Sequence, residues 1–194
     1  MLKKSSLLIA FVLILDQLLK VWIKTNMMIG QEIYFFDWFI LHFTENNGMA
    51  FGMEFGGNLG KYILSIFRII AIVAIGVYWV KLANTQVKKG IIYSISLILA
   101  GAIGNMIDSA FYGMIFSESY GQIATVFERG YSSFLQGKVV DMFYFPLING
   151  HFPSWFPFVG GNHFIFFRPI FNIADAAIST GVINILIFHR SFFK

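Results

Sequence analysis

The chain has 194 residues, of which 57% are hydrophobic, 19% are aromatic and 12% are charged. Soluble domains carry about 25% charged residues, so this composition excludes an ordinary soluble globule and a disordered chain. The absence of cysteine excludes disulfides, a thiol nucleophile and thiolate metal ligands. The net charge of +4 is too small to indicate a nucleic-acid partner. The composition is typical of an integral membrane protein.

Four apolar segments predict membrane-spanning helices, because a bilayer core of ~30 Å needs about 20 apolar residues. They are Ser5–Lys24, Lys61–Val80, Ile91–Phe111 and Phe171–Phe188, the last of which is barely long enough. The first segment resembles a secretory signal, but it contains Asp16 and Lys20 and ends without a small-residue cleavage site. We therefore expect it to be a retained span. The chain has no repeats or linkers, which predicts a single integral-membrane domain over residues 1–194.

The distribution of basic residues predicts the orientation in the membrane. The two tails and the short connection between the second and third spans contain seven Lys and Arg residues. The two long segments on the other side, Thr25–Gly60 and Tyr112–Ile170, contain three. The positive-inside rule therefore places both termini in the cytoplasm and the two long segments outside.

Parts of these outer segments predict a small β-sheet. Ile33–Thr44 (IYFFDWFILHFT), Val139–Phe145 (VVDMFYF) and His163–Arg168 (HFIFFR) are rich in the aromatic and branched residues that favour strands. The more polar Ser117–Gly137 predicts an additional loop or short helix. The predicted fold is a mainly α membrane protein, with four transmembrane helices and a sheet whose aromatic side chains lie among the headgroups.

Ionisable residues inside a span are costly, so those of the first span need an explanation. Asp16, Lys20 and Lys24 lie at positions i, i+4 and i+8, which places them on one face of the helix. One interpretation is an intrahelical ion pair, with Lys24 extending outward to the membrane surface. The other is a role at a polar site, and the two are compatible.

Three of the five aspartates fall near the outer membrane surface. Asp108 ends the third span, Asp141 lies in an apolar outer strand, and Asp175 lies one turn inside the fourth helix. Singly, Asp175 is explained by the helix dipole and Asp141 as a charge on an edge strand. Together they suggest a pair of carboxylates that shares a proton, because two adjacent carboxylates do not both ionise easily. Such a pair can activate water with one member and protonate a carbonyl with the other.

Other chemistry is poorly supported by the sequence. The four histidines lack the spacing of a zinc site, and no serine lies in the context of a nucleophile.

Three further polar positions lie near these aspartates or between the predicted elements. Asn105 lies three residues before Asp108, and Asn172 is a candidate helix cap. The segment Thr44–Gly52 (TENNGMAFG) is ordinarily a turn.

Five motifs resemble those of lipoprotein signal peptidase, or signal peptidase II, a bacterial aspartyl peptidase family with four spans. They are DQLLK (Asp16–Lys20), NNGMAF (Asn46–Phe51), GNMID (Gly104–Asp108), VVDMF (Val139–Phe143) and FNIADAAI (Phe171–Ile178). The motifs occur in the order of the family and cover all spans except the second. One such motif is weak evidence, but five in order are specific.

The resemblance implies an endopeptidase in which Asp141 and Asp175 are the catalytic pair. It also implies substrate-binding or supporting roles for Asp16, Asn46, Gly48, Asn105, Asp108 and Asn172. To these we add Lys20, because it shares the helix face of Asp16. The implied substrate is a prolipoprotein with a diacylglyceryl-modified cysteine, cut just before that cysteine. The resemblance further implies a monomer in the bacterial inner membrane, in contact with lipid, with its site at the outer face and no metal or organic cofactor.

The chain differs from the family pattern after Asp108, where Ser109 replaces the usual arginine. Arg68, inside the second span, is otherwise unexplained and could supply the missing cation. We therefore predict a contact between Arg68 and Asp108, and simple extension of Arg68 toward the headgroups is the alternative. Met49 stands where the family has a small residue, and the segments 112–138 and 146–170 are longer than usual.

Two other classes of function remain as alternatives. A small proton- or cation-coupled transporter could use Asp16, Asp108 and Asp175 as a relay, but the inner halves of the third and fourth spans are apolar. A structural subunit leaves Asp141 and Asp175 unexplained. Purified protein discriminates between them, because a peptidase cleaves lipidated substrate without an ion gradient.

Overall fold

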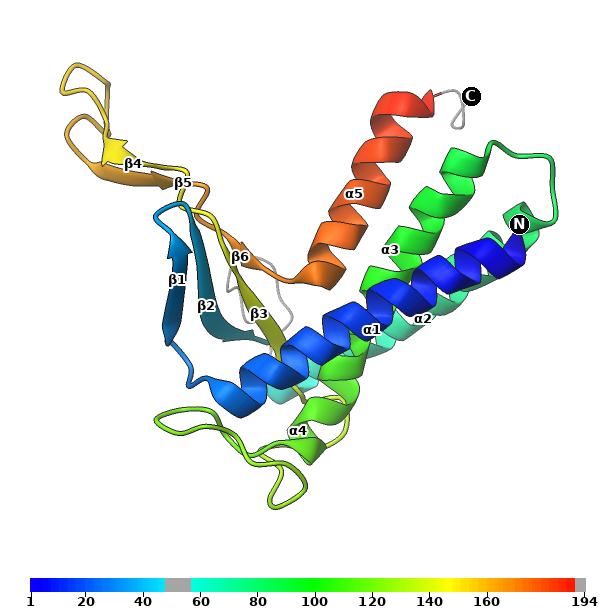
Figure 1. Ribbon diagram of the computed structural model, residues 1–194, viewed down its shortest axis with the longest axis horizontal. Coiled ribbons are helices and arrows are strands. Elements are labelled where there is room, and N and C mark those ends of the chain that lie inside the picture. The colour runs from blue at the N-terminus through cyan, green and yellow to red at the C-terminus, as the bar shows by residue number, and fades with distance from the viewer. Residues whose placement is uncertain (48–56, 191–194) are drawn as a thin grey trace.

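The computed structural model describes residues 1–47 and 57–190, and it contains helices and strands in the order that the sequence predicts (Figure 1). The helices are α1 (Leu2–Asn26), α2 (Gly57–Ala83), α3 (Lys89–Ile107), α4 (Gly113–Ile115) and α5 (Ile173–Phe188). The strands are β1 (Glu32–Phe36), β2 (Phe39–Asn46), β3 (Val139–Tyr144), β4 (Ile148–His151), β5 (His163–Phe166) and β6 (Ile170–Phe171). A mainly helical membrane fold with a small sheet is confirmed.

Three helical stretches are long and apolar enough to cross a membrane. They are Leu2–Asn26, Leu59–Ala83 and Lys89–Ile115, the last of which joins α3 to α4 through a π-helical turn, Asp108–Tyr112. The fourth predicted span is shorter than expected, because Ile170–Phe171 pairs as β6 and Asn172 caps the helix. The 16 residues of α5 extend about 24 Å.

The outer faces of the long helices are apolar and exposed. On α1 the exposed fractions of Leu7 and Leu18 are 62% and 63%, and on α2 those of Phe67 and Ile70 are 67% and 62%. Large apolar surfaces of this kind mark a membrane-contacting region in a chain with such long apolar helices.

The middle helix, α3, packs against α1, α2 and α5 (Figure 1). Gly101 and Gly104 allow the close approach of α5, because a Cβ atom at Gly101 would lie 2.2 Å from the carbonyl oxygen of Ala174. The same atom at Gly104 would lie 2.8 Å from Asp16 Oδ2 on α1. The interpretation of these glycines as helix-packing residues is confirmed.

The main sheet has the strand order β1-β2-β3-β6, with every neighbouring pair antiparallel. The prediction of one strand over Ile33–Thr44 is wrong, because Asp37 and Trp38 form a turn that divides it into a hairpin. The predicted strand at His163 is confirmed as β5, but it pairs with β4 in a separate two-stranded sheet. Ser117–Gly137 is an irregular loop.

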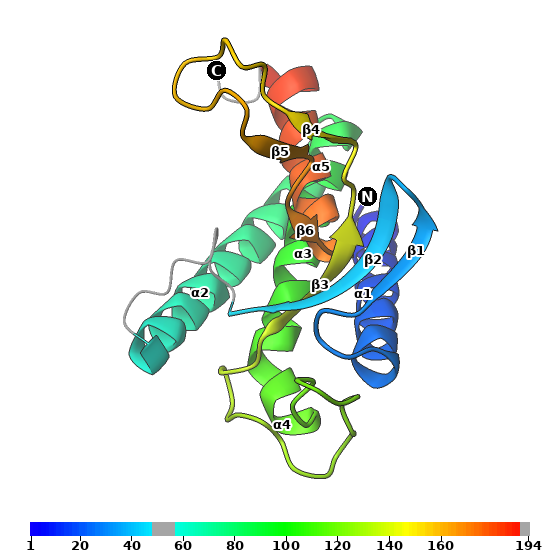
Figure 2. The same cartoon turned by 90° about the vertical axis from the view of Figure 1, so that its left-hand side faces the viewer.

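A hydrophobic core joins the sheet to the C-terminal ends of α1 and α3. Its fully buried members include Ile23 from α1, Met27 directly after α1, Phe43 from β2, and Val140 and Met142 from β3. Val140 and Met142 alternate with Asp141 along β3, and all three side chains are buried. This core fixes β3 across the ends of the helices, as Figure 2 shows from the side of the sheet.

Candidate active site

Asp141 and Asp175 come from adjacent elements, although they lie 34 positions apart in the sequence. Asp141 is in β3, and Asp175 is in the first turn of α5, directly after β6. The pairing of β6 with β3, through Phe143 and Phe171, brings the start of α5 to β3. Asn172 then starts α5 with a reciprocal cap, since its side chain accepts a hydrogen bond from the Asp175 N–H at 2.9 Å.

Two asparagine side chains hold the two carboxylates. Asn172 Nδ2 donates to Asp141 Oδ1 at 2.7 Å, and the backbone N–H of Asn172 donates to Asp175 Oδ2 at 3.3 Å. Asn105 Nδ2, from α3, donates to the other oxygen of Asp175 at 2.8 Å. Asn172 Nδ2 also donates to Asn105 Oδ1 at 3.1 Å. The four side chains therefore form one hydrogen-bonded group.

The environment of Asp141 favours its protonated form. The side chain is 4% exposed, and burial raises the pKa of this carboxyl to about 7, with a further contribution from the negative charge of Asp175. Lys20 and the hydrogen bond from Asn172 oppose the shift. A carboxyl that titrates near neutral pH beside a second carboxylate is suited to acid–base chemistry.

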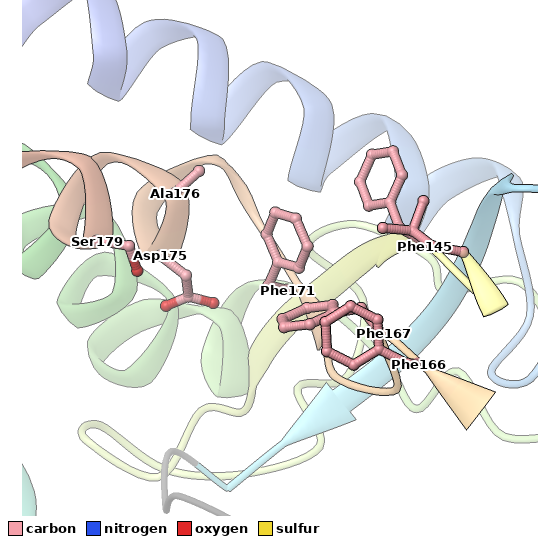
Figure 3. Close-up of a pocket in the computed structure, with 8 residues that line it drawn as sticks. Phe145, Phe166, Phe167, Phe171, Asp175, Ala176 and Ser179 are labelled. Carbon is pink, nitrogen blue, oxygen red and sulfur yellow. The ribbon is translucent and has the colours of Figure 1, made fainter. Parts of the chain in front are cut away.

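An apolar cavity of about 400 Å³ opens beside Asp175. Its lining includes the rings of Phe145, Phe167 and Phe171, with Asp175 and Ser179 contributed by α5 (Figure 3). The aromatic rings lie on one side and the carboxylate lies on the other (Figure 3). The cavity can therefore accept an apolar group next to a polar reacting centre.

A buried ionic network lies beneath the two carboxylates. Lys20 Nζ is 2.9 Å from Asp16 Oδ2, 2.8 Å from Asp108 Oδ2 and 3.0 Å from Asn105 Oδ1. Backbone donors also contact the two carboxylates, since Ala174 N–H donates to Asp16 Oδ1 and Val140 N–H donates to Asp108 Oδ2. The intrahelical pair of Asp16 and Lys20 is confirmed, and the same residues tie α1 to α3 and α5, while Asp108 continues the network to β3.

Sequence reasoning missed two residues of this network. Gln17 Nε2 donates to Asp108 Oδ1 at 3.0 Å and to Asp16 Oδ2 at 3.1 Å, and the Tyr112 hydroxyl donates to Gln17 Oε1 at 3.2 Å. Gln17 is a polar residue inside an apolar span and follows Asp16 directly, which is the signal that could have identified it.

The predicted contact between Arg68 and Asp108 is wrong. Both oxygens of Asp108 are occupied by Lys20, Gln17 and the Val140 N–H, and no ion pair joins Arg68 to Asp108 in the described part of the chain. Arg68 instead donates to Ser109 Oγ at 3.5 Å, and its charge interacts with that of Asp175. Lys20 takes the place of the missing cation because α1 packs directly against this end of α3.

The predicted outward extension of Lys24 is also wrong. Its ammonium group is fully buried, 2.5 Å from Glu45 Oε1 and 2.8 Å from Ser119 Oγ. The ring of Tyr131 lies 5.0 Å from the same nitrogen. Lys24 therefore fixes the end of β2 and the loop after α4 to α1, because a buried ammonium needs partners of opposite charge.

Asn46 is the last residue of β2 and pairs with Val139, two residues before Asp141. This register places it beside the strand that carries Asp141. Gly48, the remaining predicted site residue, lies outside the described residues. The described site therefore brings together Asp16, Lys20, Asn105, Asp108, Asp141, Asn172 and Asp175. Asn46 lies on the strand beside Asp141, and Arg68 contacts Ser109 instead of Asp108.

Comparisons with known proteins give consistent similarities over nearly the whole chain. A family model described as signal peptidase (SPase) II matches residues 8–192. A protein named lipoprotein signal peptidase from Porphyromonas gingivalis is 50% identical over 188 residues, which cover 95% of this chain and 82% of the relative. A protein of the same name from Amoebophilus asiaticus is 40% identical over 183 residues, with 92% and 74% covered. A solved structure described as a bacterial membrane enzyme at 1.9 Å resolution matches with a TM-score of 0.63 and 28% identity, covering 95% of this chain and 91% of the other.

Proposed function

Because the chain belongs to the signal peptidase II family, and is thus a membrane-bound aspartyl endopeptidase, we propose that it removes the signal peptide from diacylglyceryl-modified prolipoproteins. Cleavage takes place just before the lipidated cysteine. The observation that supports this proposal best is the hydrogen-bonded group of Asp141, Asp175, Asn105 and Asn172 beside an apolar cavity.

In this mechanism Asp141 and Asp175 act as an acid–base pair. Asp141, with its raised pKa, carries the shared proton at neutral pH and donates it to the carbonyl oxygen of the scissile peptide. Asp175 accepts a proton from a water molecule, and the oxygen of that water attacks the carbonyl carbon. Collapse of the tetrahedral intermediate breaks the C–N bond, and the leaving amine takes up a proton from the pair.

The two asparagines keep this pair in place. Asn172 donates hydrogen bonds to both carboxylates. Asn105 accepts a hydrogen bond from Lys20 at Oδ1 and donates one from Nδ2 to Asp175. Because Lys20 donates to Asn105 Oδ1, the Asn105 side chain is held with Nδ2 facing Asp175. A fixed orientation of this kind lowers the entropic part of the barrier.

The cavity beside Asp175 supports a substrate with a large apolar group at the cleavage point. Phe145, Phe167 and Phe171 would contact an acyl chain or an apolar side chain next to the scissile bond. The polar reacting centre lies at one end of the exposed apolar helices, which agrees with a peptide bond presented at a membrane surface. We further propose that this surface is the outer face of the bacterial inner membrane, with both termini in the cytoplasm.

The test uses the purified protein in detergent with a diacylated prolipoprotein and no ion gradient. We expect release of the signal peptide, and no release from the same precursor with serine in place of its modified cysteine. Asp37→Asn is a matched control, since Asp37 lies exposed in the turn between β1 and β2. A preparation that cleaves neither precursor but moves protons or cations across a vesicle membrane would favour the transporter alternative.

A further inference from the structure

The segment 146–169, which contains β4 and β5 and which we term the aromatic arm, is one of the most exposed apolar features of the described chain. Near its tip the exposed fractions of Trp155 and Phe158 are 77% and 103%. At its base, Ile148 and Phe166 are each 54% exposed. Neighbouring apolar side chains of this size, left uncovered, mark an interaction surface.

The charge of the aromatic arm restricts what it can contact. Arg168 is its sole charged residue, and it contains no aspartate, glutamate or lysine. His151 and His163 face each other across the two strands, with ring centroids 5.2 Å apart. A surface of tryptophan, phenylalanine and proline without acidic groups is the composition found where proteins meet the headgroup region of a bilayer.

The direction of the aromatic arm brings it back toward the membrane. In Figures 1 and 2 the arm leaves the main sheet toward the same side as α5 runs, whereas the loop after α4 extends to the opposite side. With α5, the fourth predicted span and an apolar helix, entering the membrane from Ile173, the arm extends toward the bilayer and the loop extends away from it. The extended part of the arm on this side is β5, whose four residues span about 13 Å, and the turns of the tip lie beyond it.

We propose that the aromatic arm inserts its tip into the headgroup region of the membrane that the protein's own helices cross. Trp155 and Phe158 would enter the boundary between headgroups and acyl chains, and Arg168 would lie near the phosphates. The β1–β2 turn extends this surface, since Trp38 is 51% exposed and its ring packs against that of Phe145, 6.3 Å away.

The contact has a consequence for the cavity beside Asp175. Phe166 and Phe167, at the base of the arm, line the cavity together with Asp175 (Figure 3). Lipid that holds the tip therefore also fixes the aromatic wall of the cavity. This consequence rests on the proposed function, whereas the membrane contact itself does not.

The absence of cysteine allows a direct test in the full chain, because a single introduced cysteine takes a nitroxide label without other changes. The three labelled variants are Phe158→Cys at the tip of the arm, Val73→Cys on the exposed face of α2 and Tyr120→Cys in the loop after α4. Val73 and Tyr120 are 59% and 83% exposed, so all three labels have room. The measurement is the rate of collision with oxygen, which concentrates in lipid, relative to a water-soluble nickel chelate, with the protein in phospholipid nanodiscs.

We expect the oxygen-to-nickel ratio at Phe158→Cys to exceed that at Tyr120→Cys by several-fold and to approach the ratio at Val73→Cys. An oxygen-to-nickel ratio at Phe158→Cys equal to that at Tyr120→Cys would overturn the membrane contact. Protection of the label from both reagents would also overturn it, because it indicates a protein partner.

The link to the cavity is tested by enzyme kinetics. The double variant Trp155→Ser with Phe158→Ser should raise KM several-fold in nanodiscs and leave kcat nearly unchanged. Tyr120→Ser with Phe127→Ser is the matched control, and an equal KM in the two double variants would remove the link to the cavity without affecting the label result.

Discussion

Lys20 on α1 and Asp108 at the end of α3 form an ion pair of 2.8 Å, and both side chains are completely buried. The same ammonium group contacts Asp16 and Asn105, so each of its three protons has an acceptor. Asn105 donates in turn to Asp175. A cation on the first helix therefore positions a carboxylate on the last one.

Replacing Lys20 by methionine should destabilise the protein strongly. Asp16 and Asp108 would then remain buried without a cation, and the loss of one partner from a buried ion pair costs about 3–5 kcal/mol. Thermal unfolding in detergent should show a clearly lower Tm for Lys20→Met and an unchanged Tm for Lys4→Met, an exposed position of the same helix. The double variant Lys20→Met with Asp108→Asn should recover part of the lost Tm. Equal Tm values for wild type and Lys20→Met would contradict a stabilising role for the buried ionic network.

Asp141→Asn and Asp175→Asn should each reduce kcat by about 10³-fold or more, because general acid–base catalysis alone contributes about 10²–10⁴-fold. The double variant should be no worse than either single variant, since the pair fails as a unit. Cleavage of diacylated precursor is the measurement, with folding checked by the Tm. Substantial activity in either single variant would remove that residue from the catalytic pair.

The rate should fall on the alkaline side of neutral pH. The proposed acid, Asp141, is protonated below its raised pKa of about 7 and loses the proton as pH rises through that value. We therefore expect kcat/KM to decrease about tenfold per pH unit above about pH 7. A profile measured from about pH 5 to about pH 9 that stays flat above neutrality would contradict this role for Asp141.

The stability of the protein should change over the same range of pH. The pKa of Asp141 is raised from 3.8 to about 7, so folding favours its protonated form, and this stabilisation is present at low pH and is lost as pH rises from 3.8 through 7. Asp141→Asn does not titrate, so it should gain stability relative to wild type, by up to about 4 kcal/mol at high pH. A constant difference in Tm between the two proteins would argue against a raised pKa.

Arg68→Leu should lower kcat about tenfold, because the guanidinium acts on the charge of Asp175 and contacts Ser109. Arg68→Leu with Ser109→Arg should recover part of the activity, since position 109 lies next to the same group. Arg129→Leu, in the exposed loop after α4, is the control and should leave kcat unchanged. Failure of the Ser109→Arg rescue would mean that the position of the cation matters as well as its charge.

The orientation in the membrane is tested with an impermeant thiol reagent on intact cells. A cysteine at Gln122, in the loop after α4, should react from outside, and one at Thr85, between α2 and α3, should not. Both positions are exposed, so the difference reports the side of the membrane. Reaction of Thr85→Cys with Gln122→Cys silent would invert the proposed topology and place Asp141 on the cytoplasmic side.

The sequence alone determined the helices, β3, β5 and the candidate carboxylates. Apolar runs of about 20 residues have few alternatives to a membrane helix, and a carboxylate in or beside such a run needs a specific reason. For this reason Asp108, Asp141 and Asp175 could be singled out from five aspartates before their contacts were known, and the resemblance to the family then implied that Asp141 and Asp175 are the catalytic pair. The turn at Asp37–Trp38 escaped prediction because Asp37 is its only turn-favouring residue, and aromatic and branched residues that favour strands surround it on both sides.

The tertiary structure decided which charges meet. The first helix has Asp16, Lys20 and Lys24 on one face, and the sequence places Lys20 within reach of Asp16 but not of Asp108. The packing of α1 against α3 set the Lys20–Asp108 pair, and the packing of α1 against β2 set the Lys24–Glu45 pair. The contact between Arg68 and Ser109 arose in the same way, from the packing of α2 against α3. Spacing along one helix is fixed by its geometry, whereas the rotation of one helix against another depends on side chains from distant parts of the chain.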